Sequence, residues 1–217
     1  MYSKTSGSGG SLYSTAGQRK YINAAERTRF IAAALACPRP KLKSLCLTLA
    51  FTGCRISEAL ALCAGAIEAE EGSVAIRSLK KRSHAVIVRE VPIPPVCIKI
   101  LRTVHGLAQA RPDALLWPWS RSRAWQLVKS VMDQAGIGRG IHATPKGLRH
   151  GFGLHAIRSG VPLNLVQRWL GHASLTTTSI YLQAVGTEER EIAARMWTPT
   201  APARSRHKAR SAPSKTH

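Results

Sequence analysis

The sequence predicts a mainly α-helical domain with a small antiparallel β-sheet, which is an α+β fold. Two observations support this prediction. Apolar residues recur at helical spacing on both sides of a central stretch, and within that stretch β-branched runs alternate with turn signals. The 217 residues are enough for one domain with a buried core. We expect a flexible leader over residues 1–19, a folded domain over residues 20–197 and a basic, disordered tail over residues 198–217.

Local start and stop signals define the first helices. Asn23, followed three residues later by Glu26, is a capping-box pattern that begins a helix running to about Ala36. A second apolar-periodic helix runs to Thr52 and ends at Gly53. The stretch "RISEALAL" opens a third helix. Residues 66–94 then contain two turn signals between β-branched runs, so we expect a sheet of two or three antiparallel strands there.

The helical period returns after this sheet. Val96, Ile100, Leu101 and Val104 form the predicted apolar face of one helix, and residues 127–132 form that of the next. Further on, the predicted elements are a helix that begins with the cap Thr144-Pro145 and ends at Gly160, a short helix that ends at "LGH", and an amphipathic helix over residues 187–197.

The chain carries a strong excess of positive charge. Lys and Arg number 32 against 11 Asp and Glu, and the formal net charge is +21. Such an excess favours a polyanionic partner, which is nucleic acid or, less often, an anionic membrane surface. No apolar run reaches the roughly 18 residues of a membrane span, and the Ser/Gly-rich N-terminus has no apolar signal core. We therefore expect a cytoplasmic, nucleoid-associated protein with no membrane partner.

Four short stretches carry side chains that can act together on a phosphodiester. They are "TGCRISEAL" with Arg55 and Glu58, "SLKKRS" with Lys80 and Lys81, "TPKGLRH" with Lys146 and Arg149, and "LGHASLTTTSIYL" with His172 and Tyr181. Each stretch alone also has an ordinary structural interpretation, such as a solvated charge, a turn, a helix cap or a core tyrosine. Lys146 favours function, because a cation near a helix N-terminus opposes the macrodipole by roughly 0.3–1 kcal/mol unless an anion lies nearby.

The chemistry of the set is that of metal-free phosphoryl transfer. Two arginines can grip non-bridging oxygens, a histidine can donate to developing charge, a tyrosine can attack phosphorus and a lysine can protonate the leaving oxygen. No carboxylate cluster suited to Mg²⁺ is present in the sequence, and the five cysteines form no CxxC pair. We therefore expect no metal site and buried thiols rather than disulfides.

The order and spacing of these stretches resemble the catalytic domain of the tyrosine recombinase (phage integrase) family. The similarity runs from about Tyr21 to Trp197 and is most specific in "LRHGFGLHAIRSGVPLNLVQRWLGHASLTTTSIY". It implies a mostly helical domain with a three-stranded sheet at its edge, in which the polar stretch over residues 174–179 forms a turn before a helix that carries Tyr181. It also implies an enzyme that breaks and rejoins double-stranded DNA through a 3′-phosphotyrosine link, with no metal, ATP or other cofactor.

The resemblance implies a role for each candidate side chain. The roles are phosphate binding for Arg55 and Arg149, support of Arg55 for Glu58, protonation of the leaving oxygen for Lys80, transition-state donation for His172, nucleophilic attack for Tyr181, and DNA contacts for Lys81 and Arg82. Lys146 stands where the family usually has a histidine. Members of the family also usually carry a helical DNA-clamping domain before the catalytic domain, whereas here the first predicted helix already begins near Asn23, as in a catalytic domain standing alone or a short form.

Three functions fit these features. The leading hypothesis is a site-specific recombinase or integrase of a mobile genetic element. The alternatives are a type IB topoisomerase-like enzyme and a DNA-binding accessory protein that lacks strand exchange, although the presence of every charged site position argues against the accessory protein. The helix over residues 187–197 either joins protomers into a homotetramer on paired DNA sites, as the resemblance implies, or closes the chain's own core.

Overall fold

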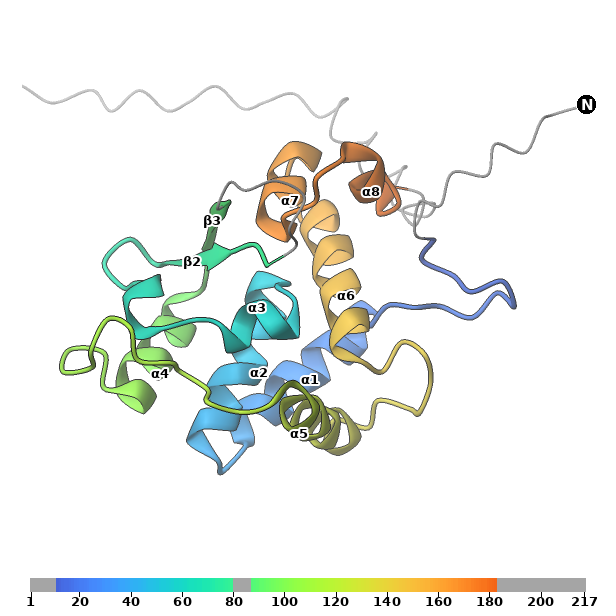
Figure 1. Cartoon of the computed structure of the whole chain (residues 1–217). Coiled ribbons are helices and arrows are strands. Elements are labelled where there is room, and N and C mark those ends of the chain that lie inside the picture. Colours follow the sequence, from blue (N-terminus) through green and yellow to red (C-terminus); the bar gives the residue numbers. More distant parts are fainter. Residues whose placement is uncertain (1–10, 80–86, 183–217) are drawn as a thin grey trace, which may run out of the picture. The chain divides into compact units, whose positions relative to one another are not determined.

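The computed structural model describes residues 11–79 and 87–182. Within these residues the chain is mostly helical with one three-stranded antiparallel sheet, so the predicted fold class is confirmed (Figure 1). The elements are α1 (Ala24–Ala36), α2 (Pro40–Thr52), α3 (Ile56–Leu60), the 3-10 helix η1 (Ala64–Ala66), β1 (Ile67–Glu68), β2 (Ser73–Arg77), β3 (Val88–Pro92), α4 (Pro95–His105), α5 (Arg121–Gln134), α6 (Pro145–Arg158), α7 (Leu163–Leu170) and α8 (Leu175–Ser179). The predicted basic turn, the helix over residues 187–197 and the tail lie outside the described residues.

The predicted helix starts are confirmed. At α1 the Asn23 side chain accepts from the backbone N–H of Glu26 at 2.9 Å, and the Glu26 carboxylate accepts from the backbone N–H of Asn23 at 3.0 Å. At α6 the Thr144 hydroxyl accepts from the N–H of Gly147 at 3.0 Å, and Pro145 occupies the first helical position. These bonds satisfy N–H groups that have no partner inside the helix.

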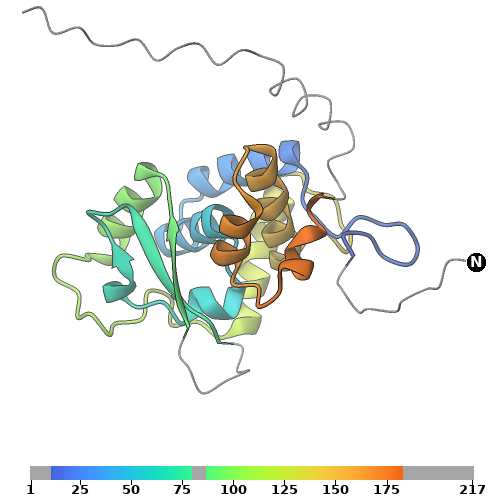
Figure 2. The ribbon, with the colours of Figure 1, turned by 90° about the horizontal axis from the view of Figure 1, so that it is seen from above.

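Helix α2 forms the centre of the main core. It packs against α1, α3, α4, α5 and α6 (Figure 1), and most of its side chains are buried. Together with α4, the sheet lies to one side of the other α-helices, as Figure 2 shows from a second direction. In the described part of the chain, no helix is both long and apolar enough to cross a bilayer.

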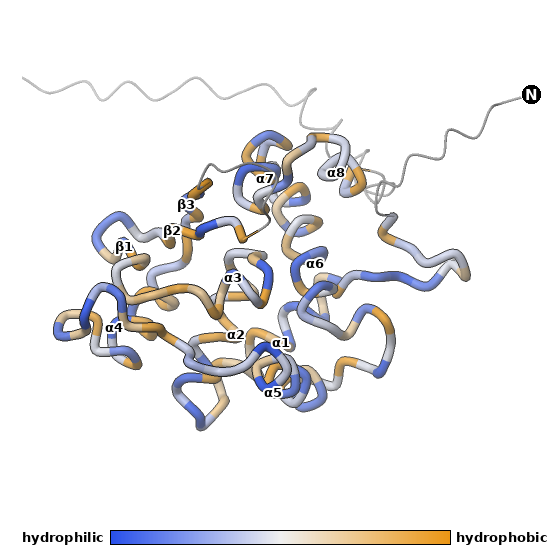
Figure 3. Tube along the Cα trace, in the orientation of Figure 1, coloured by the Kyte–Doolittle hydropathy of each residue, from blue (hydrophilic) through white to orange (hydrophobic). Residues whose placement is uncertain are grey.

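The sheet has the order β1-β2-β3, with Val74 opposite Val91 and Ile76 opposite Arg89. Because strand residues two apart share a face, Arg89 lies on the same buried face as Val74, Ile76 and Val91. The trace of β3 in Figure 3 accordingly combines hydrophobic and hydrophilic residues. Because Arg89 is charged and buried, it needs hydrogen-bonding partners, which are Glu58 and the carbonyl of Trp169.

Two predictions differ from the structure. The buried face of α4 consists of Cys97, Ile98 and Leu101, whereas Val96 is 47% exposed. The predicted face missed the buried Cys97 and included Val96, which lies on the exposed side of the first turn. Residues 174–179 were predicted as a turn before a tyrosine helix, but the Ser174 hydroxyl caps α8 within that stretch and Tyr181 follows the helix in a turn.

A smaller apolar cluster packs around α6, α7 and α8. It contains Tyr181 and also Leu12, which belongs to the predicted leader. Tyr13 and Arg19 form an isolated antiparallel bridge, so residues 11–19 differ from the expected flexible segment. Trp169 packs against both clusters and therefore connects the smaller cluster to the main core.

Candidate active site

Three chain segments that are distant in the sequence meet at Arg149 on α6. The Arg149 guanidinium donates from Nη1 to the carbonyl of Gly53, after α2, at 2.8 Å. It donates from Nη2 to the carbonyl of Leu170, at the end of α7, at 2.7 Å. Burial, followed by the charge of Arg55, lowers the pKa of Arg149 to about 10. The side chain therefore stays protonated at neutral pH, and it fixes the ends of two helices.

The second predicted arginine, Arg55, lies at the start of α3 beside Glu58. Its Nη1 donates to Glu58 Oε1 at 2.8 Å, and its backbone N–H donates to Glu58 Oε2 at 2.9 Å. The predicted support of Arg55 by a buried Glu58 thus agrees with the geometry, since Glu58 is 1% exposed. About a third of the Arg55 side chain remains accessible, so it can also meet a ligand.

The Glu58 carboxylate has a further partner that sequence reasoning missed. Arg89 on β3 donates from Nη2 to Glu58 Oε2 at 2.6 Å and from Nε to the carbonyl of Trp169 at 2.7 Å. Burial alone would raise the pKa of Glu58, but the Arg89 charge and the bonds from Arg55 and Arg89 place it below its ordinary value. Arg89 therefore joins the sheet to Glu58 and to the end of α7. The sequence feature that could have identified Arg89 is a charged residue two positions before Val91, and therefore on the same inner face of the strand.

The end of α7 sets the position of His172. Gly171 ends the helix at a φ of 64°, and a Cβ there would lie 2.9 Å from Arg89 Nη1. Glycine is required by both the backbone conformation and this close approach. His172 Nδ1 lies 2.9 Å from the Thr178 hydroxyl on α8. Burial, followed by the charges of Arg149 and Arg55, lowers the pKa of His172 to about 3, so the ring is neutral at pH 7.

Tyr181 is buried, with 0% of its surface exposed. Its ring lies nearly parallel to that of His172, at 16° and a centroid distance of 6.2 Å. Its hydroxyl lies 3.1 Å from Nδ1 of His150, a second residue that sequence reasoning missed although it directly follows Arg149. Burial raises the pKa of Tyr181 to about 12, although Arg149 and Arg55 act in the opposite direction.

A cleft brings the predicted cations together. The described residues that line it include five Lys or Arg and two His but no Asp or Glu: Lys20, Arg55, Arg121, Lys146, Arg149, His150 and His172. Lys146 is exposed there on the first turn of α6, three residues before Arg149. Tyr181 does not line this cleft, but its neighbours Thr177 and Ile180 do. The cleft is thus a cationic site suited to an anion, with the tyrosine close to its wall.

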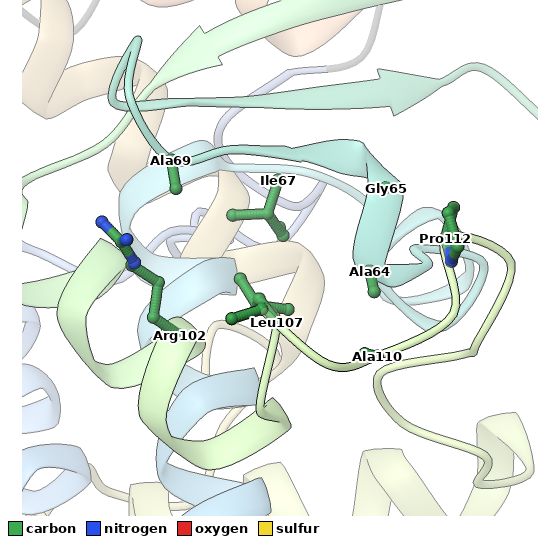
Figure 4. A pocket seen from close by; sticks show the side chains of 9 residues that line it. Ala64, Gly65, Ile67, Ala69, Arg102, Leu107, Ala110 and Pro112 are labelled. Carbon is green, nitrogen blue, oxygen red and sulfur yellow. The ribbon is translucent and has the colours of Figure 1, made fainter.

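The remaining predicted site residues, Lys80, Lys81 and Arg82, lie outside the described residues. A second recess lies between η1, the end of α4 and the segment that follows it. Figure 4 shows its lining, which is mostly Ala, Gly, Ile, Leu and Pro, with Arg102 near Ala69. Arg102 pairs with Glu70 at 3.4 Å. This lining has no nucleophile and no acid–base pair, so we place the candidate chemistry in the cationic cleft.

The cationic cleft can hold an anion beside a buried tyrosine. Residues 20–187 match the phage integrase family. The chain therefore belongs to the phage integrase family.

Among curated relatives, the tyrosine recombinase XerD of Neisseria meningitidis serogroup B is 36% identical over 152 residues, which cover 64% of this chain and 49% of that protein. The tyrosine recombinase XerA of Pyrococcus furiosus is 29% identical over 167 residues, or 71% of this chain and 54% of that protein. The chain thus spans about half the length of the curated relatives it matches.

Solved structures agree on the fold. A crystal structure of XerA recombinase is similar with a TM-score of 0.67 and 26% identity, and the match covers 83% of this chain and 66% of that one. The catalytic domain of bacteriophage HP1 integrase has a TM-score of 0.58 and 18% identity, with 83% of this chain and 98% of that one covered.

Proposed function

We propose that this chain is the catalytic part of a site-specific recombinase or integrase that serves a mobile genetic element. It cleaves and rejoins double-stranded DNA through a 3′-phosphotyrosine intermediate. The observation that carries this proposal is the convergence of Arg55, Arg149 and His172 at one cationic cleft, with the ring of Tyr181 stacked on that of His172 behind its wall. The names of the curated relatives, which are tyrosine recombinases, support it.

The proposed roles follow from the hydrogen-bond donors that each side chain does not use within the protein. Arg149 uses two N–H bonds on backbone carbonyls, and the guanidinium has five donors, so others can bind a non-bridging phosphate oxygen. Arg55 reaches the same cleft with its accessible part. If the Thr178 hydroxyl donates to Nδ1 of neutral His172, the ring proton is on Nε2. That N–H can then donate to the charge that develops on phosphorus-bound oxygens.

In the cleavage step, Tyr181 Oη attacks phosphorus as the bond to the DNA 5′-oxygen breaks. We propose that Lys80 protonates this leaving oxygen, that Lys81 and Arg82 contact DNA phosphates, and that Lys146 donates to a phosphate oxygen. Tyr181 is buried and does not line the cleft, but its hydroxyl contacts His150, which does, so the phosphate must reach the hydroxyl from the side of His150 before attack. The released 5′-hydroxyl then attacks a partner's phosphotyrosine, which conserves the bond energy.

The proposed assembly is a homotetramer on paired DNA sites, joined through residues 187–197, in the cytoplasm with the nucleoid. Its test is a size measurement of the protein on one DNA site and on two paired sites. Deletion of residues 187–217 should prevent pairing of the sites yet permit cleavage of single sites. Loss of folding in this deletion would instead assign the segment to the chain's own core.

The nucleophile provides the direct test of the function. The protein is incubated with a library of nicked duplexes whose central sequence is randomised, and DNA that becomes covalently attached is recovered and sequenced. We expect wild-type protein and Tyr13→Phe to form the adduct, because Tyr13 lies outside the cleft. Tyr181→Phe should bind the selected duplex but form no adduct. An adduct mapped to Tyr2, Tyr13 or Tyr21, or none with the wild type, would contradict the proposal.

A further inference from the structure

His150 is a side chain of the site to which neither the motif nor the resemblance gives a role. It lies on α6 directly after Arg149, and its ring lines the cationic cleft. Nδ1 of the ring is 3.1 Å from the Tyr181 hydroxyl, which is the oxygen that must attack phosphorus. The two rings are tilted by 56° at a centroid distance of 6.0 Å, so the contact is made by the ring nitrogen and not by stacking.

The other candidate acceptors are less well placed. His172 presents the face of its ring to Tyr181, and its Nδ1 is engaged with the Thr178 hydroxyl. Lys146 stands where a proton-accepting histidine would be expected, but a protonated amine has no acceptor atom. Arg55 and Arg149 are excluded because a guanidinium has no acceptor atom either. Among the described residues that line the cleft, His150 is therefore the group that, with its ring proton on Nε2, has a lone pair within hydrogen-bond distance of the nucleophile.

We propose that His150 is the general base that accepts the Tyr181 proton during DNA cleavage. This inference rests on the proposed function. As the bond between Tyr181 Oη and phosphorus forms and the bond from phosphorus to the 5′-oxygen breaks, the hydroxyl proton moves to His150 Nδ1. The leaving oxygen takes a different proton from the general acid. In the rejoining step the imidazolium returns its proton to the departing tyrosine oxygen, so the base is regenerated.

The charges around His150 suit this role. Burial, followed by the charges of Lys146, Arg149 and Lys20, lowers its pKa to about 4, so the ring is neutral and able to accept at pH 7. Tyr181, with its pKa raised to about 12, supplies almost no phenolate by itself. The nearby cations would disfavour the imidazolium in the free protein. A phosphodiester bound in the cleft offsets those charges, because an opposite charge nearby favours the protonated ring. The groups that face the ring are Lys20, Lys146, Arg149, His172 and Tyr181.

The test uses the duplex selected in the covalent-trapping experiment, with a 5′-bridging phosphorothiolate at the cleaved position. A thiolate leaves with little protonation, so the single-turnover rate reports on the nucleophile's proton. For the wild type the rate should rise with pH through one ionisation, since the neutral ring is the acceptor. His150→Ala should react about 10²–10³-fold more slowly, with a rate that rises with hydroxide across neutral pH. Added imidazole should restore much of that rate.

Two further variants separate catalysis from positioning. In His150→Asn an amide oxygen can accept the tyrosine's hydrogen bond but is not basic, so this variant should be about as slow as His150→Ala. His155→Ala, the same change on the exposed side of α6, should react like the wild type. If His150→Asn is fully active, or if the phosphorothiolate reaction of His150→Ala keeps the wild-type rate and pH profile, the inference is wrong and the proposed function stands. If the wild type forms no Tyr181 adduct, both are wrong.

Discussion

At the scale of single residues, the site depends on a carboxylate shared between two guanidinium groups. Glu58 is bonded to Arg55 on one oxygen and to Arg89 and the Arg55 backbone on the other. Its charge is compensated inside the protein, and only Arg55 extends to the cleft. Arg89 does not line the cleft, and its contribution is to hold Glu58 and the end of α7 in position. It is a positioning residue.

This role predicts a large loss of stability for Arg89→Met. The change keeps much of the side-chain volume but leaves the Trp169 carbonyl without its donor and Glu58 with a single arginine. We expect the free energy of unfolding in urea to fall by about 3–5 kcal/mol, the range for removing one partner of a buried ion pair. Arg102→Met is the matched control. It removes an exposed pair with Glu70 and should cost less than about 1 kcal/mol. Equal losses in the two variants would contradict this account.

At the scale of elements, helix α6 carries much of the site along its length. Lys146, Arg149 and His150 lie in its first turns, and Gly153 lies against the ring of Tyr181, the proposed nucleophile. A Cβ added at Gly153 would come within 2.6 Å of Tyr181 Cζ. The glycine is therefore needed for the close approach of ring and helix.

We expect Gly153→Ala to lower stability by about 1–3 kcal/mol, as overpacking does, although alanine is intrinsically better in a helix by about 1 kcal/mol. In a chain that already carries Tyr181→Ala, the ring is absent, so adding Gly153→Ala should cause no further loss of stability from overpacking. The control is Gly138→Ala, because a Cβ there meets nothing within 4 Å and the backbone does not require glycine. Thermal unfolding of the full chain measures all three. A Gly153→Ala variant as stable as Gly138→Ala would show that the ring moves aside freely.

The elements also show which features the sequence could predict. Helix ends at Asn23, Thr144 and Gly53 were predicted correctly because a cap depends on neighbours within a few residues. Arg89 was not identified because its partner Glu58 is 31 residues away and meets it only when the sheet packs beside α3. His150 has the same explanation, since its partner Tyr181 is also 31 residues away. The predicted buried face of α4 was wrong because hydrophobic periodicity shows that a helix has an apolar stripe but not which residues lie at the centre of that stripe.

At the scale of the whole molecule, the net charge of +21 should dominate the affinity for DNA. The logarithm of the binding constant should fall linearly with the logarithm of salt concentration, by about 0.9 for each phosphate neutralised. Residues 198–217 contain five Lys or Arg. Replacing all five by Ser should therefore reduce the slope by up to about 4.5 units. Fluorescence anisotropy with a labelled duplex of arbitrary sequence measures it.

A tail in which five uncharged residues are replaced by Ala is the control for this measurement, and its slope should equal that of the wild type. Both variants should still form the Tyr181 adduct on the selected duplex once they are saturated with DNA. Failure of the charge-free tail to form the adduct at saturation would mean that the tail does more than add affinity.

The two arginines of the cleft differ in what else depends on them. Arg149 is 6% exposed and fastens two backbone carbonyls from distant segments, whereas the Arg55 side chain is about one third exposed and bonds within its own helix turn. In a living cell, marginally stable proteins are removed by proteases. A genetic screen for inactive variants would therefore recover Arg55 substitutions as abundant protein and Arg149 substitutions as depleted protein. Steady-state protein level, measured beside activity, would be needed to interpret any mutation at Arg149.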